Sequence, residues 1–312
     1  MMPNAAIGLT LGPVPYLWEE ERWRDFYFRI ADEAPLDVVV LGETVCSKRL
    51  HFTEAAIGEV IERLEASGKL VQLSTLALVT LERELQYQKE VASSTSHMVE
   101  ANDLSALHLL RGRPHAVGPL VNVYNASTAK FLAKNGATTI CLPPELPATS
   151  VQVITRECRD IQYELFAFGR LPLAMSARCA HARSKGKIKD NCQFVCGQDP
   201  DGLVVSTLAK KPFLTLNGVQ TMSFTCQAIL PDRDQLAALG VNSLRLSPQT
   251  CDMVSVARLF RSLISGQIGG DEAAEALRRI YPDVPLSNGF HHQQAGAAWI
   301  GRNRNAEMGS AQ

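Results

Sequence analysis

Long hydrophobic runs are missing from this chain of 312 residues. Its longest apolar runs, such as Val38-Val39-Val40-Leu41, fall far short of the roughly 18 residues that a membrane-spanning helix needs. The N-terminus reads Met1-Met2-Pro3-Asn4 and has no basic segment before an apolar stretch, which argues against a secretory signal. We therefore expect a soluble, cytoplasmic protein without a membrane span.

Several motifs that mark common enzyme classes are also absent. No glycine fingerprint GxGxxG follows the first predicted strand, and the chain has no GxSxG elbow, HExxH helix or phosphate-binding loop. These absences remove the support for a dinucleotide-binding fold, a serine hydrolase, a zincin or an NTPase. An excess of one charge is lacking too, because 31 basic and 32 acidic residues leave a formal net charge of -1. Nothing in this balance indicates nucleic acid as a partner.

Cysteine, in contrast, is plentiful, with eight residues that a reducing compartment should keep from forming disulfides. Cys179, Cys192 and Cys196 lie in one short polar segment, and Cys46 follows a predicted strand far upstream. Thiolates are soft ligands that select zinc or iron–sulfur clusters. We predict a four-thiolate site between the folded core and a covering loop. The remaining cysteines stand in or beside apolar runs and are predicted to pack in the core: Cys141, Cys158, Cys226 and Cys251.

Spacing alone leaves the metal open between zinc and an iron–sulfur cluster. Zinc sites usually close through CxxC turns, which this chain lacks, so the cluster is preferred. His181 could replace one thiolate in a Cys3His zinc site, although a lone loop histidine is more often solvated. Cations are frequent between Arg178 and Lys189, and Lys48 and Arg49 follow the upstream cysteine. Such cations would offset the charge of an anionic cluster, or they form a solvated basic surface.

Short apolar runs alternate with amphipathic stretches through most of the chain. Strands are predicted at 36–41, 70–76, 106–110, 120–123, 138–142, 163–168, 203–208, 213–216 and 243–246. Helices are predicted at 54–67, 79–91, 126–134, 151–159, 228–239 and 253–265. This alternation favours an α/β fold built as a TIM-like (β/α) barrel, complete or distorted. We expect one barrel domain over residues 1–290, with a cysteine loop at 176–200 covering one end, and a loosely held tail at 291–312.

In such a barrel, functional residues gather at the carboxyl ends of the strands. Glu43 and Cys46 follow one predicted strand, Asn125 follows another, and the strand that contains Glu164 leads to Arg178 and the cysteine loop. We therefore expect the upstream cysteine to meet the loop at one face of the barrel. The other four residues are weaker candidates for a pocket or for the surroundings of the ligands. A helix cap or a surface ion pair is the alternative role for each, and no catalytic residue is assigned.

One segment resembles a known signature. Residues 164–176, ELFAFGRLPLAMS, followed by Arg178-Cys179, resemble the signature of the U32 peptidase family. That signature runs Glu-x-Phe-x-x-Gly, then a short hydrophobic link that usually carries a cysteine, then a serine and a cysteine. Here the link reads Arg170-Leu171-Pro172, so the first signature cysteine is absent. This departure and the spacing of the four candidate ligands are similar to the branch of the family that acts in ubiquinone biosynthesis.

The resemblance implies a 4Fe-4S cluster held by Cys46, Cys179, Cys192 and Cys196. It further implies a heterodimer with a homologous U32-family subunit and oxygen-independent ring hydroxylation of a ubiquinone precursor, presented by a soluble carrier. The peptidase label has little weight, because no pair of nucleophile and base for peptide hydrolysis is evident. Two alternatives stay open: an iron–sulfur-dependent hydroxylase of transfer or ribosomal RNA, and a non-catalytic electron-transfer or scaffold subunit. The net charge of -1 disfavours the RNA alternative.

Overall fold

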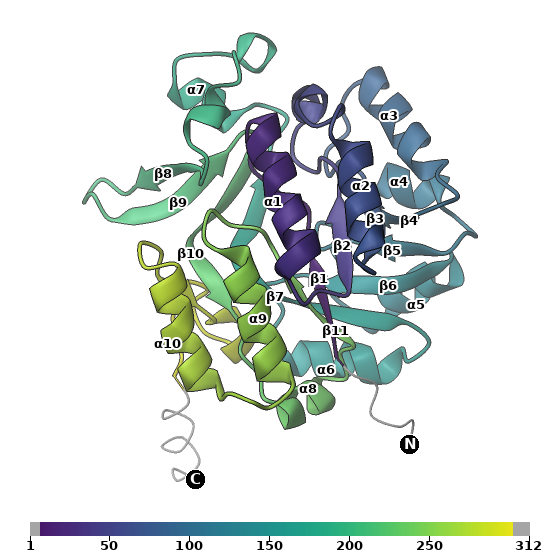
Figure 1. Cartoon of the computed structure of the whole chain (residues 1–312), viewed down its shortest axis with the longest axis vertical. Helices are drawn as coiled ribbons and strands as arrows, with labels where there is room; N and C mark the ends of the chain where they lie inside the picture. Colours follow the sequence, from purple (N-terminus) through teal and green to yellow (C-terminus); the bar gives the residue numbers. More distant parts are fainter. Residues whose placement is uncertain (1–6, 302–312) are drawn as a thin grey trace.

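Eight parallel strands close into a barrel in the computed structural model, which describes residues 7–301 (Figure 1). Strand β11 pairs with both β1 and β7, and these two pairings complete the ring. The predicted (β/α) barrel is therefore confirmed as a closed one. In their order around the ring, the strands are β11 (Ser243–Leu246), β1 (Gly8–Leu11), β2 (Val38–Leu41), β3 (Leu70–Ser74), β4 (Met98–Ala101), β5 (His115–Val117), β6 (Ala137–Leu142) and β7 (Gln162–Met175).

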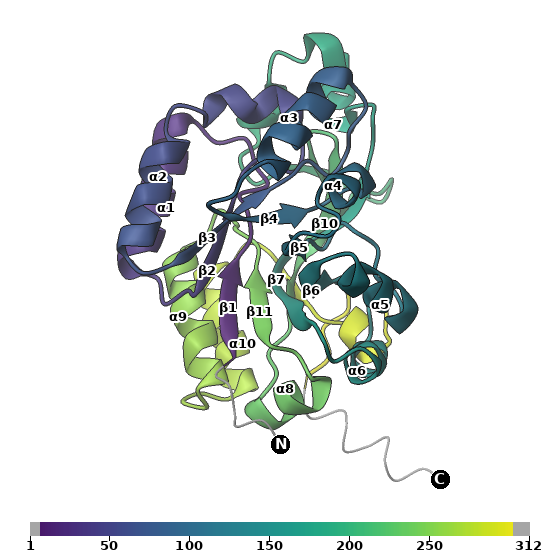
Figure 2. The same cartoon turned by 90° about the vertical axis from the view of Figure 1, so that its right-hand side faces the viewer.

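Helices cover the outside of the ring (Figures 1 and 2). Their ends follow ordinary capping chemistry. At the start of α8, for example, the Asp232 carboxylate accepts a hydrogen bond from the backbone N–H of Gln235, and Gly240 ends the helix with a φ of 67°. The helices are α1 (Glu20–Glu33), α2 (Ile57–Ala66), α3 (Glu82–Ala92), α4 (Leu104–Leu109), α5 (Ala126–Lys134), α6 (Ala148–Glu157), α8 (Arg233–Leu239), α9 (Met253–Ile264) and α10 (Gly270–Ile280).

Strand β7 is much longer than its neighbours, and its second half leaves the barrel. It pairs antiparallel with β10 (Gln220–Ala228). The sheet continues from β10 to β9 and β8, while β12 adds a parallel pairing to β10. Both views place α7, in the segment between β7 and β8, at the end of the barrel opposite α8 (Figures 1 and 2). The bounds of these elements are Ala180–Ser184 for α7, Leu203–Ser206 for β8, Pro212–Asn217 for β9 and Leu286–Ser287 for β12.

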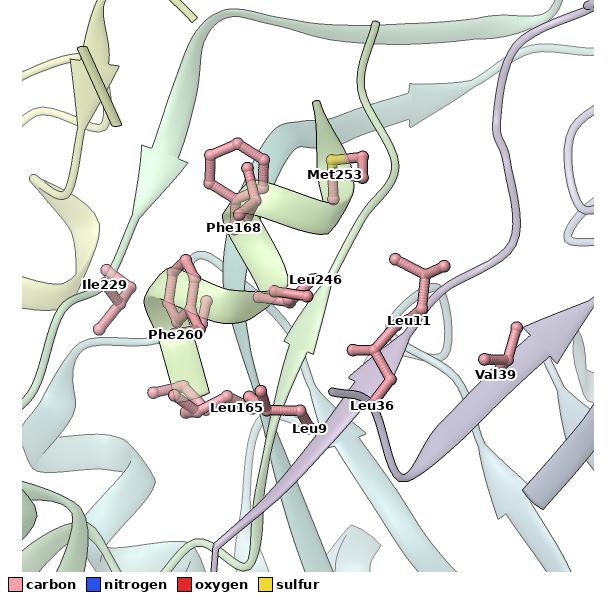
Figure 3. Close-up of a cluster of buried hydrophobic side chains, with 14 of the residues drawn as sticks. Leu9, Leu11, Leu36, Val39, Leu165, Phe168, Ile229, Leu246, Met253 and Phe260 are labelled. Atoms are coloured by element: carbon pink, nitrogen blue, oxygen red, sulfur yellow. The ribbon is translucent and has the colours of Figure 1, made fainter. Parts of the chain in front are cut away.

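The main hydrophobic core lies between the barrel wall and the surrounding helices. Strands β1, β7 and β11 contribute Leu9, Leu165 and Leu246, which meet Met253 and Phe260 of α9 (Figure 3). Successive side chains of a strand point to opposite faces, so every second residue of a barrel strand faces this core. Full burial of each such side chain contributes about 2 kcal/mol to folding. The other half of the strand residues face the inside of the barrel.

Charged side chains occupy the inside of the barrel, where many barrels carry aliphatic layers. Arg245 of β11 donates to the Glu100 carboxylate of β4 at 2.6 and 3.0 Å and to the Glu164 carboxylate of β7 at 2.9 Å. All three residues are buried. Burial lowers the pKa of Arg245, but the two carboxylates outweigh this effect and raise it well above its usual value. One guanidinium thus ties three strands together across the ring.

Two of the predicted strands are wrong. Residues 106–110 belong to helix α4, whose first turn is capped by the Asp103 side chain, and residues 120–123 form a loop after the short strand β5. The predicted helix 228–239 begins only at Arg233, since Ala228 ends strand β10. The cause is the polar interior: β4 and β5 are four and three residues long and carry Glu100 and His115, so no apolar run marks them.

The described part of the C-terminal region stays bound to the barrel domain. Asn288 exchanges two hydrogen bonds with the backbone of Ile300, at 2.7 and 3.0 Å, and Trp299 lies under the Arg278 guanidinium of α10. The rest of the predicted tail, residues 302–312, lies outside the described residues. From residue 7 to residue 301, the structure contains no helix that is both long enough and apolar enough to cross a membrane.

The Arg245→Met variant should be less stable than the wild type by about 3–5 kcal/mol, because it leaves two buried carboxylates without their shared cation. The exposed pair of Arg258 and Glu33, 3.8 Å apart, offers a matched control. Arg258→Met should cost less than about 1 kcal/mol. Urea unfolding followed by circular dichroism measures both free energies. Equal losses in the two variants would contradict the role given to the buried trio.

Candidate functional site

The four candidate ligands meet at one end of the barrel. Cys46 lies just after β2, and the other three lie in the segment that follows β7. Cys46, Cys179 and Cys192 pack around one small apolar cluster, and Cys179 lies near both Cys192 and Cys196. Cys46 and Cys196 in turn share a neighbour, Arg49. All four are free cysteines, so segments far apart in the sequence supply one group of thiols.

Local backbone geometry turns the loop cysteines toward this point. Cys179 caps the short helix α7, and its Sγ accepts a hydrogen bond from the backbone N–H of Ala182 at 3.3 Å. Between Cys192 and Cys196, Gln193 and Phe194 both adopt left-handed conformations, with φ of 48° and 51°. Each such conformation costs a residue with a side chain about 1 kcal/mol or more, and it persists only where the surroundings enforce it.

Contacts with the segment after Cys46 fix the loop in place. The Phe194 ring packs against Phe52 and His51, with centroid distances of 5.0 and 5.2 Å. Lys48 Nζ donates to the backbone carbonyl oxygens of Lys189 and Asp190 at 2.8 and 3.0 Å. The loop is therefore fastened to the same turn that carries Cys46.

Glu43 organises that turn. Its Oε1 accepts hydrogen bonds from the backbone N–H groups of Val45 and Cys46 at 2.6 and 3.0 Å. Burial raises the pKa of Glu43, while Arg49 and these two hydrogen bonds lower it. Glu43 thus positions Cys46 through the backbone and is a positioning residue here.

Burial also governs the thiols. It raises the pKa of Cys46 to about 11 and also raises the pKa of Cys179. Without metal these two thiols are protonated at neutral pH, and a metal would displace their protons. Four sulfurs are the donor type of iron–sulfur and zinc centres and not of magnesium or calcium sites, but the thiols as placed do not form a site for one metal ion. Across residues 7–301, no three His, Cys, Asp or Glu side chains form a group that could hold a single metal ion.

His181 is committed to other partners. It is fully buried, which contradicts the expectation of a solvated loop histidine. Its Nε2 pairs with Asp199 Oδ2 at 2.9 Å, and its Nδ1 accepts from the backbone N–H of Gly218 at 3.4 Å. Burial lowers the pKa of His181 although Asp199 opposes this effect. Both ring nitrogens are used, so the imidazole is not presented to the thiols.

The other candidates lie apart from one another. Asn125 is the exposed cap of α5, where its Oδ1 accepts from the backbone N–H of Thr128 at 2.9 Å. Glu164 lies inside the barrel beside Arg245. Arg178 is exposed on the cysteine loop. The four cysteines predicted to pack in the core do so: Cys141, Cys158 and Cys226 are buried, and Cys251 packs against the main core.

Cations line the outer side of the cysteine loop. They surround a groove of about 700 Å³ whose wall includes Cys179 and in which Asp190 is the single acidic residue. The basic character predicted for the loop therefore forms a continuous surface. Its cations are Lys48, Arg83, Arg178, Arg183, Lys187 and Lys189.

A separate pocket, with about 50 Å³ of enclosed space, opens at the mouth of the barrel. Thr44, two residues before Cys46, lines it, and so does Pro15, whose carbonyl oxygen accepts a hydrogen bond from Arg49. The pocket and the group of thiols are therefore neighbours. Its lining further includes Asn102, Leu120, Phe166, Arg170, Gln220, Met222 and Arg245.

Two polar atoms of this pocket lack partners among the described residues: Asn102 Oδ1 and Arg170 Nε. Arg170 is otherwise held by Asp201, at 3.0 Å. A ligand that donates to Asn102 and accepts from Arg170 would satisfy both atoms. Neither Asn102 nor Asp201 was predicted from the sequence. Asn102 directly follows β4, a strand that no apolar run marks, and Asp201 lies beyond the last cysteine of the loop. The signal that could have found Asn102 is its place directly after a barrel strand.

The Phe194→Ala variant should loosen the cysteine loop without weakening the barrel, because the Phe194 ring packs against Phe52 and His51, which lie outside the barrel strands. Hydrogen exchange within residues 185–198 should become faster, and exchange of the barrel strands should not change. Phe131→Ala, on exposed α5, serves as the control for loss of an aromatic ring. Unchanged exchange of the loop would show that other contacts hold it.

Residues 23–301 match Peptidase family U32. A truncated 3-deoxy-D-arabino-heptulosonate 7-phosphate synthase from Thermotoga maritima has 12% identity and a TM-score of 0.42, over 92% of this chain and 93% of that one. A tryptophan synthase complex from Pyrococcus furiosus gives 11% identity and a TM-score of 0.42, over 88% and 96%. Because the family match covers most of the sequence, the chain belongs to peptidase family U32.

Proposed function

We propose that this chain is the iron–sulfur subunit of an oxygen-independent ring hydroxylase, similar to UbiV of ubiquinone biosynthesis. Cys46, Cys179, Cys192 and Cys196 would hold a 4Fe-4S cluster, which supplies one-electron redox chemistry when bound. The observation that carries the proposal is the meeting of four free cysteines beside a pocket at the barrel mouth. Active sites of such barrels lie at this end.

The chemistry around the thiols supports a cluster. A 4Fe-4S centre with four thiolates is anionic, so nearby cations favour it. Lys48 and Lys189 lie next to the thiols in the groove, and Arg49 lies beneath them. With His181 engaged by Asp199 and Gly218, the thiols are the donors that remain.

The mouth pocket is the candidate site for the ring of a ubiquinone precursor. Phe166 and Met222 offer apolar contacts for a ring, while Asn102 Oδ1 and Arg170 Nε suit a ring hydroxyl that donates and accepts. A pocket with about 50 Å³ of enclosed space has no room for a long isoprenoid tail. We therefore infer that the tail stays on a soluble carrier or partner, with the homologous subunit UbiU completing a heterodimer.

The basic groove favours a second candidate, a hydroxylase of transfer or ribosomal RNA. Six cations could follow a phosphate backbone. None of the residues that line the groove is aromatic, however, so bases would find no stacking surface there. A non-catalytic electron-transfer or scaffold subunit is the third candidate, and such a subunit would leave the mouth pocket without a role.

Anaerobic preparations should contain about four irons and four sulfides per chain and absorb in the visible range. Replacing Cys46, Cys179, Cys192 or Cys196 by alanine should remove or convert the cluster, because each variant lacks one ligand. Cys251→Ala removes a cysteine that packs against the core and should retain full iron content. Stoichiometric zinc without visible absorption in an anaerobic preparation would refute the cluster.

Deleting the gene in its host should abolish ubiquinone made without oxygen and leave oxygen-dependent synthesis unchanged. A Cys192→Ala chain should fail to restore anaerobic ubiquinone, whereas Cys251→Ala should restore it. Quinones extracted from cultures grown with and without oxygen are measured by mass spectrometry. The RNA candidate predicts normal quinone and the loss of a hydroxylated nucleoside from digested RNA, and that result would replace the present proposal.

A further inference from the structure

Arg49 is a buried cation without an ion-pair partner. The residue is only 2% exposed. Its Nη1 donates to the backbone carbonyl oxygen of Pro15 and its Nη2 donates to Asn217 Oδ1, each at 2.8 Å. Its Nε has no partner within residues 7–301. In the same part of the chain, no carboxylate lies within ion-pair distance of this guanidinium.

The other buried arginines are compensated. Arg245 binds Glu100 and Glu164, and Arg170 binds Asp201 at 3.0 Å. A charge taken out of water without a counter-ion is costly, and proteins avoid it unless the charge has a function. Arg49 is therefore the exception that needs an explanation.

Two thiols, of Cys46 and Cys196, and the Glu43 carboxylate lie near Arg49. Burial lowers the pKa of Arg49, while Glu43, Cys196 and Cys46 raise it. The Glu43 carboxylate already accepts hydrogen bonds from the backbone N–H groups of Val45 and Cys46. Glu43 acts on the guanidinium from beyond ion-pair distance and compensates its charge only in part, so a negative centre at the sulfurs would add to this compensation.

The backbone keeps space for this side chain. Gly218, after β9, has a φ of 63°, and a Cβ at this position would lie 2.6 Å from Arg49 Nη2. Asn217 Nδ2 also donates to Pro15 O at 2.6 Å, so the partners of the guanidinium are held to each other. Strand β9, the loop after β1 and the turn after Cys46 thus build one fixed seat for a cation.

We propose that Arg49 is the built-in counter-cation of the thiolate cluster, a positioning residue that favours its more negative, reduced state. The inference rests on the proposed 4Fe-4S site. Reduction adds one electron from the reductant and makes the centre more negative by one charge, which a buried guanidinium stabilises more than a solvated one. Arg49 should also slow the loss of iron, because it offsets the mutual repulsion of four thiolates.

Arg49→Met removes the positive charge, whereas Arg49→Lys keeps the charge and removes the two guanidinium N–H donors that bind Pro15 and Asn217. In anaerobic preparations, a redox titration followed by electron paramagnetic resonance should give a lower midpoint potential for Arg49→Met. Iron transfer to a chelator should become about tenfold faster, as expected when a nearby buried cation that contributes about 1.4 kcal/mol is removed. Arg49→Lys should restore most of the potential, since it keeps the charge.

Arg183→Met is the matched control, because it removes one positive charge from an exposed residue of the groove, where water screens the charge. It should shift the potential less than Arg49→Met does. If Arg49→Met fails to fold, Asn217→Asp carries the test: it gives Arg49 a carboxylate partner and should lower the potential in the same direction.

The presence of the cluster and the role of Arg49 are tested by different results. A wild-type chain without iron and sulfide would refute the cluster and with it this inference. If the wild-type chain holds a cluster, but Arg49→Met or Asn217→Asp leaves its midpoint potential and its rate of iron loss unchanged, the role of Arg49 is refuted and the cluster is not. In that case Arg49 would be a structural clamp between Pro15 and Asn217.

Discussion

The buried ion trio at the centre of the barrel is the constraint on which the rest of the structure depends. Arg245, Glu100 and Glu164 come from three strands, and their bonds span the ring. A trio with two carboxylates and one cation is stable only when every member is present and the geometry is exact. The trio therefore fixes how β4, β7 and β11 face one another, and the pocket at the mouth is built directly on it, since Glu100 and Arg245 form part of its lining.

The family signature acquires a physical meaning along β7. Glu164 binds Arg245, Phe166 lines the mouth pocket, and Gly169 lets β7 approach β11 closely. Gly169 has a φ of 129°, and a Cβ there would lie 2.6 Å from Ser247 Cβ, so no other residue fits. The same strand then runs on to Cys179. One segment thus connects the core, the pocket and the loop of cysteines.

The sequence predicted those parts of the molecule whose signal is local. Strands with outward apolar residues, such as 243–246, were predictable from their runs. Three of the four cysteines were predictable from their place in a polar loop, and Cys46 from its place after a strand. Glu100 and His115 interrupt the apolar pattern of the short strands β4 and β5, and the partner of Glu100, Arg245, lies across the barrel and far along the chain. The burial of His181 and the setting of Arg49 depend on Asp199, Pro15 and Asn217, which only the folded chain brings near. Long-range polar contacts leave no periodic pattern in a sequence.

The separation of Cys46 from the other three thiols has a consequence for biogenesis. Cys46 leaves the ribosome early. The segment that carries Cys179, Cys192 and Cys196 reaches its final position beside Cys46 only after β10 has paired with β7 and β11 has closed the barrel between β1 and β7. A growing chain therefore exposes single thiols in turn and holds no complete ligand set until nearly all of its barrel has been synthesised. Insertion of the proposed cluster would therefore come late in synthesis or after it, and an earlier delivery would meet a partial site.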